Sequence, residues 1–357
     1  MRKIVVAHLF NDFSGSPLVL SQVLRGFIAA GHEIDLYTSK SSGDGFLSEI
    51  DGVKNYYYPY KWHPNKWITL LRFMAAQIGL LFRLRKYKGE DVVIYVNTVL
   101  PFGAALAGRI LSLPVIYHIH ETSVQPALFK KFLFSVVSRC SKQNIYVSKF
   151  LADQEPVQGV KSQIIYNAIS PLFLDQVEIS QKDSFIVLML CSLKEYKGIW
   201  PFIKAAEACC ELQFELVLNA EQYEIDNFFA GKELPFNLKI YSAQSNVHPF
   251  YQRASLVVNL SIPDQWIETF GMTALESFAY HLPFIGPPVG GIVEVVEDGF
   301  AGFLVDSRDQ QKLNEMIKTL ASDSELYRKL QSNTQHALDR FSENVLREQT
   351  NHLVENI

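Results

Sequence analysis

The chain has 357 residues, of which 48% are hydrophobic and 20% are charged, and its formal net charge is -4. This length accommodates two domains of ordinary size, and the composition is that of a globular protein with a substantial core. The weakly acidic balance gives no basis for general binding to nucleic acid. The four cysteines include no metal-type CxxC pair, so we expect a reduced, cytosolic chain.

The N-terminal region is predicted to form a strand–loop–helix–strand unit. Lys3–Phe10 is an apolar strand, residues 11–17 form the loop NDFSGSP, Leu18–Ala30 has helical apolar spacing, and Glu33–Thr38 is a second strand. This order is typical of parallel α/β folds, which place a ligand loop at the C-terminal end of the strand. The loop contains no G-x-G-x-x-G motif, and an ordinary surface loop remains the alternative.

Residues 54–88 combine basic and aromatic side chains and include no acidic residue. The segment Trp67–Leu84 is strongly apolar, but Arg72 and Gln77 interrupt it, which disfavours a helix across a bilayer. We expect a long, partly buried helix with a basic, aromatic edge that suits anionic lipid headgroups. A core helix with a solvated face is the alternative. For the helix itself we favour the core interpretation. For the loop before the helix we favour the membrane interpretation.

Two further buried strands are expected at Asp91–Asn97 and Pro114–His120. The second ends in His118 and His120, which at a spacing of two residues face the same side. A histidine at the C-terminal end of a parallel strand lies where such sheets bind ligands. We interpret His120 as a functional residue and His118 as its structural neighbour. A hydrogen-bonded histidine at the rim of the sheet is the alternative for His120.

The polar, aperiodic segment 170–182 is expected to link two domains. The second domain begins with the apolar strand Phe185–Leu190, and the loop CSLKEYKG follows at 191–198. Positive charge in a loop after a buried strand can stabilise the negative charge that develops on a departing phosphate. Lys194 and Lys197 are therefore candidate phosphate ligands.

The most informative stretch is Asn259–Leu282, where a strand ends, a loop follows, and a helix begins near Gly271. Glu268 lies in the loop and Glu276 in the helix, with seven residues between them. The free N–H groups at the start of a helix suit a phosphate. Carboxylates beside such a site can accept hydrogen bonds from sugar or ribose hydroxyls. Two solvated surface charges are the alternative interpretation.

The run Glu268-Thr269-Phe270-Gly271 followed by Glu276 resembles the signature of the family 4 retaining glycosyltransferases. The run from Gly290-Gly291 through Glu294 to Asp298-Gly299 is similar to a second motif of that family. The resemblance implies a GT-B fold of the α/β class, with two Rossmann-like parallel-sheet domains facing one another across a cleft. The expected ranges are 1–172 for the acceptor domain, 173–335 for the donor domain, and 336–357 for a helix that crosses back to the first domain.

The same resemblance implies roles for individual residues. Glu268 would hold the hydroxyls of the donor sugar, Glu276 those of the ribose, and His120 would lie near the reacting sugar. Lys197, in a lysine–glycine pair that matches the family, would grip the donor diphosphate. The remaining expected donor contacts are Gly15, Lys194, Ser242, Phe270, Gly271, Met272, Gly290 and Gly291.

Two departures from the family pattern stand out. Ser192 occupies the position of a family arginine, and the first loop retains a single glycine, Gly15. The expected activity is transfer of a sugar from a UDP- or GDP-linked donor to a glycan or lipid-linked acceptor, with retained configuration and neither a metal nor another cofactor. The expected setting is surface polysaccharide or glycolipid assembly at the inner face of the plasma membrane. An inactive GT-B subunit that binds a partner or glycan, or a nucleotide-sugar epimerase, remains the alternative.

Overall fold

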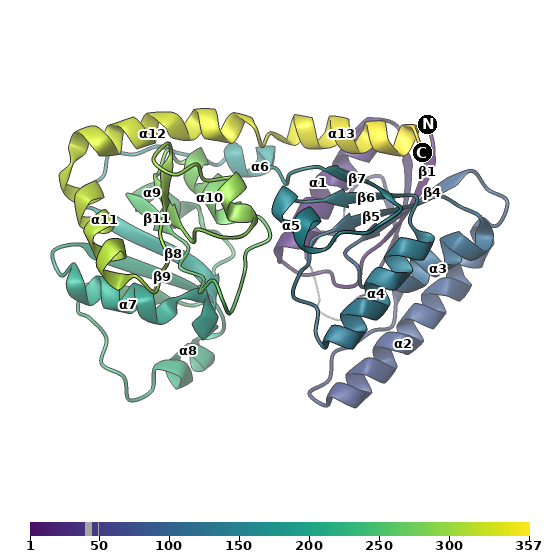
Figure 1. The fold of residues 1–357 in the computed structure, drawn as a ribbon, viewed down its shortest axis with the longest axis horizontal. Helices are drawn as coiled ribbons and strands as arrows, with labels where there is room; N and C mark the ends of the chain where they lie inside the picture. Colours follow the sequence, from purple (N-terminus) through teal and green to yellow (C-terminus); the bar gives the residue numbers. More distant parts are fainter. Residues whose placement is uncertain (40–44, 49) are drawn as a thin grey trace. The chain divides into compact units, whose positions relative to one another are not determined.

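The computed structural model describes residues 1–39, 45–48 and 50–357 as two compact units, each built around a parallel sheet (Figure 1). Unit 1 comprises Met1–Asn167 together with Glu343–Ile357, and unit 2 comprises Ala168–Ser342. The prediction of two Rossmann-like parallel-sheet domains is therefore confirmed.

The sheet of unit 1 has seven strands in the order β3-β2-β1-β4-β5-β6-β7. The order moves outward in both directions from β1 and β4, so the chain reverses its winding direction between these two strands. Their side chains are almost fully buried, as expected for parallel strands covered on both faces. The strands are β1 (Lys3–Ala7), β2 (Glu33–Ser39), β3 (Val53–Tyr58), β4 (Val92–Asn97), β5 (Val115–Ile119), β6 (Gln143–Tyr146) and β7 (Lys161–Ile164).

The helices of unit 1 pack as two groups, α1 against α13 and α2 and α4 against α3. The close approach of α1 and α13 occurs at Gly26, whose carbonyl accepts a hydrogen bond from Asn351 Nδ2 at 3.2 Å. The helices are α1 (Gly15–Ala29), α2 (Lys66–Arg83), the 3₁₀ turn η1 (Leu84–Tyr87), α3 (Phe102–Leu111), α4 (Ala127–Cys140), α5 (Lys149–Gln154) and α13 (Glu343–Glu355).

The strand β3 corrects one expectation, because Lys54–Tyr58 fall in the part of segment 54–88 that was predicted to be a loop before the long helix. They pair with β2 in parallel along the whole segment. Tyr56 stacks on Tyr37 of β2 with the ring centroids 4.8 Å apart, and the buried Tyr58 hydroxyl donates to the carbonyl of His8 at 2.7 Å. Aromatic residues favour strands once a neighbouring strand is available to pack against, and the local sequence does not reveal that neighbour.

Unit 2 has a six-stranded sheet in the order β10-β9-β8-β11-β12-β13. The strands are β8 (Ile186–Ser192), β9 (Gln213–Asn219), β10 (Leu238–Tyr241), β11 (Leu256–Val258), β12 (Phe284–Gly286) and β13 (Gly302–Leu304). The helices are α6 (Pro171–Leu174), η2 (Glu195–Lys197), α7 (Ile199–Ala208), α8 (Gln222–Phe229), α9 (His248–Arg253), α10 (Met272–Ala279), η3 (Gly291–Glu294), α11 (Gln310–Ser322) and α12 (Ser324–Asp339).

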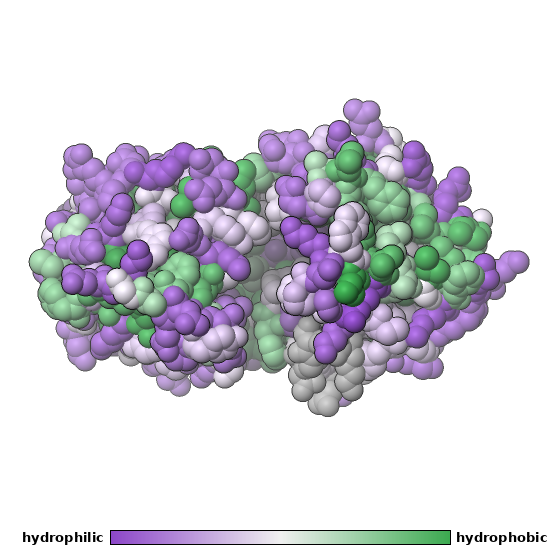
Figure 2. Space-filling model, turned by 90° about the horizontal axis from the view of Figure 1, so that it is seen from below, coloured by the Kyte–Doolittle hydropathy of each residue, from purple (hydrophilic) through white to green (hydrophobic). Residues whose placement is uncertain are grey.

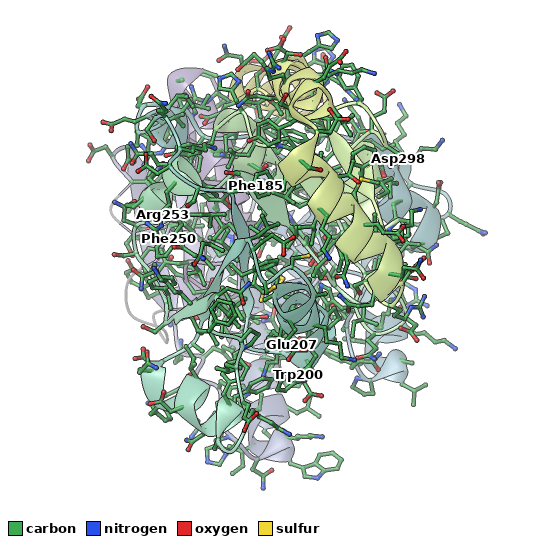
Figure 3. The ribbon with its side chains drawn as sticks, turned by 90° about the vertical axis from the view of Figure 1, so that its left-hand side faces the viewer. Phe185, Trp200, Glu207, Phe250, Arg253 and Asp298 are labelled. Carbon is green, nitrogen blue, oxygen red and sulfur yellow. The ribbon has the colours of Figure 1, made fainter. Side chains whose placement is uncertain are left out.

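The helix α9 is fixed to the sheet by Arg253 (Figure 3). Its guanidinium pairs with the buried carboxylate of Glu215 on β9 at 2.8 Å and lies 4.3 Å from the centre of the Phe250 ring. A charge pair with one buried member holds its geometry because the buried carboxylate would otherwise lose its compensation. This contact orients α9, which carries a residue of the candidate site.

The boundary between the units lies a few residues before the expected break at 172/173. The segment after Asn167 already belongs to unit 2, because Ile169 N donates to the carbonyl of Phe341 at 3.1 Å. Phe173, in α6, also packs against His248 of α9 with the ring centroids 4.4 Å apart. The predicted linker 170–182 thus contains a short helix that is anchored in the second unit.

The C-terminal helix returns to unit 1, but it begins later than the expected residue 336. The structure divides the C-terminal region into three helices, because Asp323 caps α12 through hydrogen bonds from the N–H groups of Glu325 and Leu326. The end of α12 still belongs to unit 2, and the returning helix α13 starts at Glu343. A capping aspartate between two apolar-periodic segments is the signal that would have predicted the break between α11 and α12.

Candidate functional site

The main candidate site lies in unit 2 at the C-terminal ends of three neighbouring strands. The strands β8, β11 and β12 are adjacent in the sheet, and the loops that follow them carry Lys197, Glu268 and Gly291, respectively. Ligands of open α/β sheets bind at this edge. Residues from three distant parts of the sequence therefore meet where a ligand is expected.

The centre of the site is an ion pair between Lys197 and Glu268. Lys197 Nζ lies 2.6 Å from Glu268 Oε1, which also accepts hydrogen bonds from Ser261 Oγ at 2.9 Å and Asn259 Nδ2 at 3.2 Å. All the hydrogen bonds described for this carboxylate end on Oε1. The side chain is 20% exposed. The second oxygen, Oε2, is therefore available to a ligand.

The environment keeps Glu268 ionised. Burial raises the pKa of this carboxyl, but the charge of Lys197 and the hydrogen bonds outweigh burial, and the net pKa lies below its ordinary value. Lys197 Nζ also lies 4.6 Å from the centre of the Trp266 ring, which stacks on Tyr196. The attraction between the ammonium and the ring adds to the ion pair in holding Lys197 at this position.

Glycines allow the three loops to approach one another. Gly198 has φ +82°, and a Cβ atom there would lie 2.0 Å from the carbonyl oxygen of Leu260. Gly290 has φ +97°, and a Cβ atom there would lie 2.5 Å from the carbonyl oxygen of Glu268. The same carbonyl accepts a hydrogen bond from Gly291 N at 2.7 Å. The predicted pair Gly290-Gly291 is thus brought next to Glu268 by backbone contact.

The residues Phe270, Gly271 and Met272 form the entry to α10. The Phe270 side chain is buried and packs against Phe341 with the ring centroids 5.7 Å apart, so it anchors the loop within the core. Gly271 is the residue before the helix, and Met272 opens it, partly exposed. In this part of the chain, the groups suited to an anionic ligand are the backbone N–H groups at the start of the helix.

Glu276 lies in α10, and its carboxylate is held by a buried tyrosine. Tyr251, from α9, donates its hydroxyl to Glu276 Oε2 at 2.5 Å. Burial raises the pKa of Glu276 to about 7, although the tyrosine hydrogen bond opposes the shift. Tyr251 did not emerge from the sequence as a site residue, because only the packing of α9 against α10 brings the two side chains together.

The remaining predicted donor contacts of unit 2, Lys194 and Ser242, occupy more peripheral positions. Ser192 is the last residue of β8, and Lys194 is exposed in the loop that follows. Ser242 follows β10 at the edge of the sheet, and its carbonyl accepts a hydrogen bond from Gln244 at 3.0 Å. Because β9 lies between β10 and β8, Ser242 is separated from the loop of Lys197 by an intervening strand.

Unit 1 contains a second polar cluster at the C-terminal ends of β1, β4 and β5. His120 Nε2 lies 3.0 Å from Asn97 Oδ1, and Asn97 Nδ2 lies 3.1 Å from His8 Nδ1. Asn97 Nδ2 also donates to the carbonyl of Ser16 at 3.3 Å, next to Gly15 at the start of α1. Asn97 therefore connects the two predicted elements of this unit, His120 and the loop of Gly15.

The histidines of this cluster are neutral. Burial lowers the pKa of His120 well below its ordinary value, and the neighbouring His118 and His8 lower it further. His118 is fully buried, and its Nδ1 lies 2.8 Å from the hydroxyl of Tyr95, which fits the structural role expected for it. Next to His120 in sequence, burial raises the pKa of the Glu121 carboxyl to about 7.

Asn97 and His8 were not identified from the sequence. Both are single polar residues at or after the end of an otherwise apolar strand, KIVVAH and VVIYVN. A polar residue in that position of a parallel strand points to the ligand edge of the sheet. That signal would have found Asn97, whereas its bond to His120 requires knowledge of the strand order.

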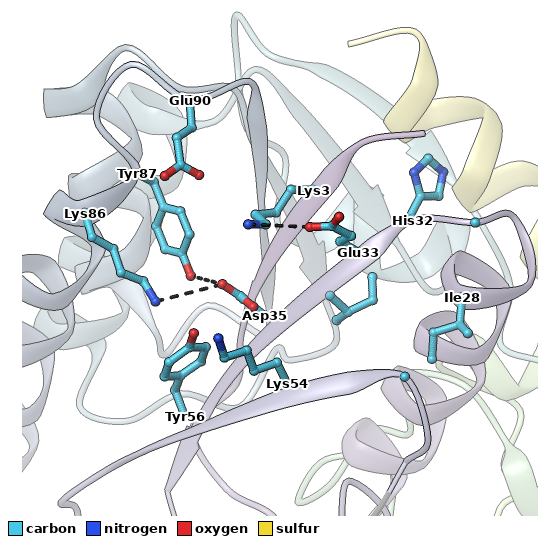
Figure 4. Close-up of a pocket in the computed structure, with 13 residues that line it drawn as sticks. Lys3, Ile28, His32, Glu33, Asp35, Lys54, Tyr56, Lys86, Tyr87 and Glu90 are labelled. Atoms are coloured by element: carbon cyan, nitrogen blue, oxygen red, sulfur yellow. Dashed lines mark hydrogen bonds and ion pairs between the residues drawn. The ribbon is translucent and has the colours of Figure 1, made fainter.

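A cavity of about 560 Å³ lies elsewhere in unit 1, at the N-terminal ends of β1, β2 and β3 (Figure 4). Lys86 extends over the Tyr56 ring, 3.9 Å from its centre, and lies 3.9 Å from Asp35 Oδ2. Tyr87 donates its hydroxyl to the same carboxylate. None of the predicted site residues lines this cavity. Among the described residues, no group of three or more His, Cys, Asp or Glu side chains is arranged to hold a metal ion.

The structure consists of two parallel α/β units with polar loops at the carboxyl ends of their strands, and comparison with known proteins gives the family. The profile Glycosyl transferases group 1 matches residues 173–337, and the profile Glycosyltransferase Family 4 matches residues 13–171. The chain therefore belongs to the group 1 glycosyltransferases of family 4 type, and its fold is GT-B. It is a glycosyltransferase, as the sequence resemblance predicts.

Individual relatives agree with this assignment. An uncharacterized glycosyltransferase of Methanocaldococcus jannaschii is 26% identical over 74% of this chain and 77% of its own. The structure of Anabaena HepE in complex with UDP and glucose superimposes with a TM-score of 0.79 at 20% identity, covering 100% of both chains. That of WaaG, a glycosyltransferase involved in lipopolysaccharide biosynthesis, has a TM-score of 0.73 at 15% identity over 99% of this chain and 100% of WaaG.

The raised pKa of Glu276 leads to a prediction about nucleotide binding. If the ionised carboxylate of Glu276 accepts hydrogen bonds from both ribose hydroxyls, affinity for free UDP or GDP should increase as the pH rises through about 7. Glu276→Gln should weaken binding by about 1.5–3 kcal/mol, the usual loss for a hydrogen bond to a charged group. It should also remove the part of the pH dependence that the carboxyl contributes. Calorimetry at several pH values measures both effects, and unchanged affinity would remove Glu276 from the site.

A second prediction concerns the charge state of His120. In the wild type, NMR of labelled imidazoles should show His120 neutral well below pH 6.5, with His120→Gln identifying its signal. Asn97→Asp places a carboxylate beside Nε2 and should raise the pKa of His120, because a nearby negative charge favours the imidazolium. Asn97→Leu, which adds no charge, is the control. A wild-type His120 that titrates near pH 6.5 would contradict the buried, neutral state.

Proposed function

We propose that this glycosyltransferase moves a sugar from a nucleotide-sugar donor to an acceptor hydroxyl, with retention of configuration and without a metal ion. The observation that carries the proposal is the Lys197–Glu268 pair at the meeting point of three ligand loops. One member supplies a cation for a diphosphate, and the other supplies a carboxylate with a free oxygen for sugar hydroxyls.

The charges of the site fit a nucleotide diphosphate as leaving group. Negative charge builds up on the diphosphate as the bond to the sugar breaks, and Lys197 together with the N–H groups at the start of α10 stabilises it. Glu268 remains ionised, so it stabilises the positive charge that develops on the sugar ring as well as binding hydroxyls. These groups do the work that a divalent metal does in other transferases.

Retention is proposed to follow a front-face course. The bond between the anomeric carbon and the phosphate oxygen breaks, and the acceptor oxygen forms its new bond on the same face. The acceptor proton passes to the departing phosphate oxygen. His120 is neutral and held by Asn97, so it can interact with sugar hydroxyls near the reacting carbon without adding a positive charge.

The donor is proposed to carry uridine or guanosine. Glu276 is placed to accept the ribose hydroxyls, and the related fold of Anabaena HepE was solved with UDP and glucose. The acceptor is proposed to be a glycan or lipid-linked glycan in surface polysaccharide or glycolipid assembly, at the cytoplasmic side of the membrane. The likeness to WaaG, which is involved in lipopolysaccharide biosynthesis, supports this setting.

An inactive subunit that binds donor without transferring sugar is the second candidate. Ser192 stands where the family has an arginine, and Lys194, the nearest additional cation in the loop, is exposed. A lysine provides a mobile point charge in place of the two-pronged geometry of arginine. Incubation with UDP- and GDP-sugars, with and without lipid-linked acceptors, separates the candidates. A transferase releases nucleotide and extends the acceptor, whereas an inactive subunit binds donor and releases no nucleotide.

Substitutions in this loop test the proposal directly. Lys197→Ala should abolish detectable transfer, because it removes the cation that faces the leaving group and leaves Glu268 unpaired. Lys194→Ala should have an intermediate effect, and Ser192→Arg should raise the rate if it restores a second fixed cation. Transfer is measured as nucleotide released per acceptor extended. Intact transfer by Lys197→Ala would show that the mechanism is wrongly placed on this loop.

A further inference from the structure

The long helix α2 has an apolar surface that the rest of unit 1 does not cover. It forms most of Lys66–Tyr87, a described segment that is long and apolar enough to cross a membrane. Only 28% of the most apolar 18-residue stretch of this segment is buried. The buried side chains are Phe73, Ala76, Gln77 and Leu80. The large exposed ones on the helix are Trp67, Ile68, Leu70, Leu71, Ile78 and Phe82. An apolar surface of this extent marks an interaction site.

The neighbouring helix α4 enlarges this surface. Phe73 of α2 contacts Phe129 of α4 with the ring centroids 5.7 Å apart, so the two helices meet. On α4, Leu128 is 80% exposed and Phe132 is 42% exposed. Figure 2 shows hydrophobic surface interspersed with hydrophilic residues on this side of the unit. We refer to the exposed apolar side chains of α2 and α4 together as the α2/α4 face.

The charges around the α2/α4 face are of one sign over a long segment. Residues 54–88 include no acidic residue, and the exposed Lys66, Arg72 and Arg83 lie on α2 itself. The exposed Trp62 lies just before α2, and the exposed Trp67 lies in its first turn. Lys131 adds a further cation on α4. Tryptophans beside lysines and arginines are typical of helices that lie at the boundary between water and anionic lipid. A protein partner would need an apolar surface bordered by carboxylates, whereas an anionic bilayer offers both features.

The contacts of α2 decide between a spanning helix and one that lies on the surface. Gln77 Oε1 accepts a hydrogen bond from Gly103 N at 3.0 Å. A Cβ atom at Gly103 would lie 2.2 Å from the carbonyl oxygen of Gln77, so α2 and α3 are in direct backbone contact. A helix held along one side by a soluble domain cannot be surrounded by lipid. Only its other side is available to the bilayer.

We propose that the α2/α4 face docks unit 1 on an anionic membrane, with α2 lying in the plane of the interface and its exposed apolar side chains inserted among the acyl chains. The exposed Lys66, Arg72 and Arg83 of α2 and Lys131 of α4 contact the headgroups. The biological reason for docking, access to a lipid-linked acceptor, rests on the proposed function. The docking itself rests on the surface alone.

The test uses the full chain and vesicles of equal parts phosphatidylglycerol and phosphatidylcholine. Trp67→Ser and Leu71→Ser remove exposed apolar side chains, and each should weaken cosedimentation with vesicles by about tenfold, the equivalent of one buried large side chain. Phe236→Ser is the matched control, because Phe236 is 87% exposed in unit 2 and should not affect binding. Added salt should weaken binding by screening the basic residues.

A second measurement separates this proposal from the proposed function. Release of nucleotide from a sugar donor to a soluble acceptor, without vesicles, should be the same in wild type, Trp67→Ser and Leu71→Ser. A chain that binds vesicles and transfers no sugar would refute the transfer proposal and leave docking intact. Equal vesicle binding by wild type and both variants would overturn docking. A dimer in solution that Leu71→Ser dissociates would also overturn it, because the face would then bind a second copy.

Discussion

The Lys197–Glu268 ion pair is the interaction on which the proposed donor site depends. Its members come from loops that follow β8 and β11, and the carbonyl of Glu268 receives a hydrogen bond from Gly291 after β12. A partly buried carboxylate without its cation would be costly, so the pair holds the loops in register as well as supplying charge. The site is thereby organised before a ligand enters, and little reorganisation is left for the moment of reaction.

The same principle of prior organisation applies in unit 1, where the interactions are neutral. Asn97 bonds to His120, to His8 and to the carbonyl of Ser16, so one amide fixes the ring of a candidate functional histidine and the position of the first loop. Burial keeps the histidines uncharged. One unit therefore contains an ionic cluster, which we propose binds a diphosphate, and the other contains a neutral polar cluster, which we propose binds sugar hydroxyls.

Much of this arrangement follows from local sequence. Apolar runs predicted the buried strands, and the sequence around Glu268 and Gly271 predicted a loop followed by a helix. What local sequence left out depends on packing between distant segments. The aromatic strand β3 needs β2 beside it, the Tyr251 hydroxyl reaches Glu276 only when α9 packs against α10, and Asn97 reaches His120 only across neighbouring strands. The sequence shows the basic and apolar composition of α2. Which side of α2 is exposed depends on which side α3 covers, and that requires the structure.

The most direct test of the account is a double-mutant cycle between Lys197 and Glu268, measured on the rate of nucleotide release from the donor in the presence of acceptor. Lys197→Met, Glu268→Gln and the double variant are compared with the wild type. If the two side chains act as one unit, the loss in the double variant is smaller than the sum of the single losses, with a coupling energy of about 0.5–3 kcal/mol. Strict additivity of the two losses would contradict the claim that this ion pair organises the donor site.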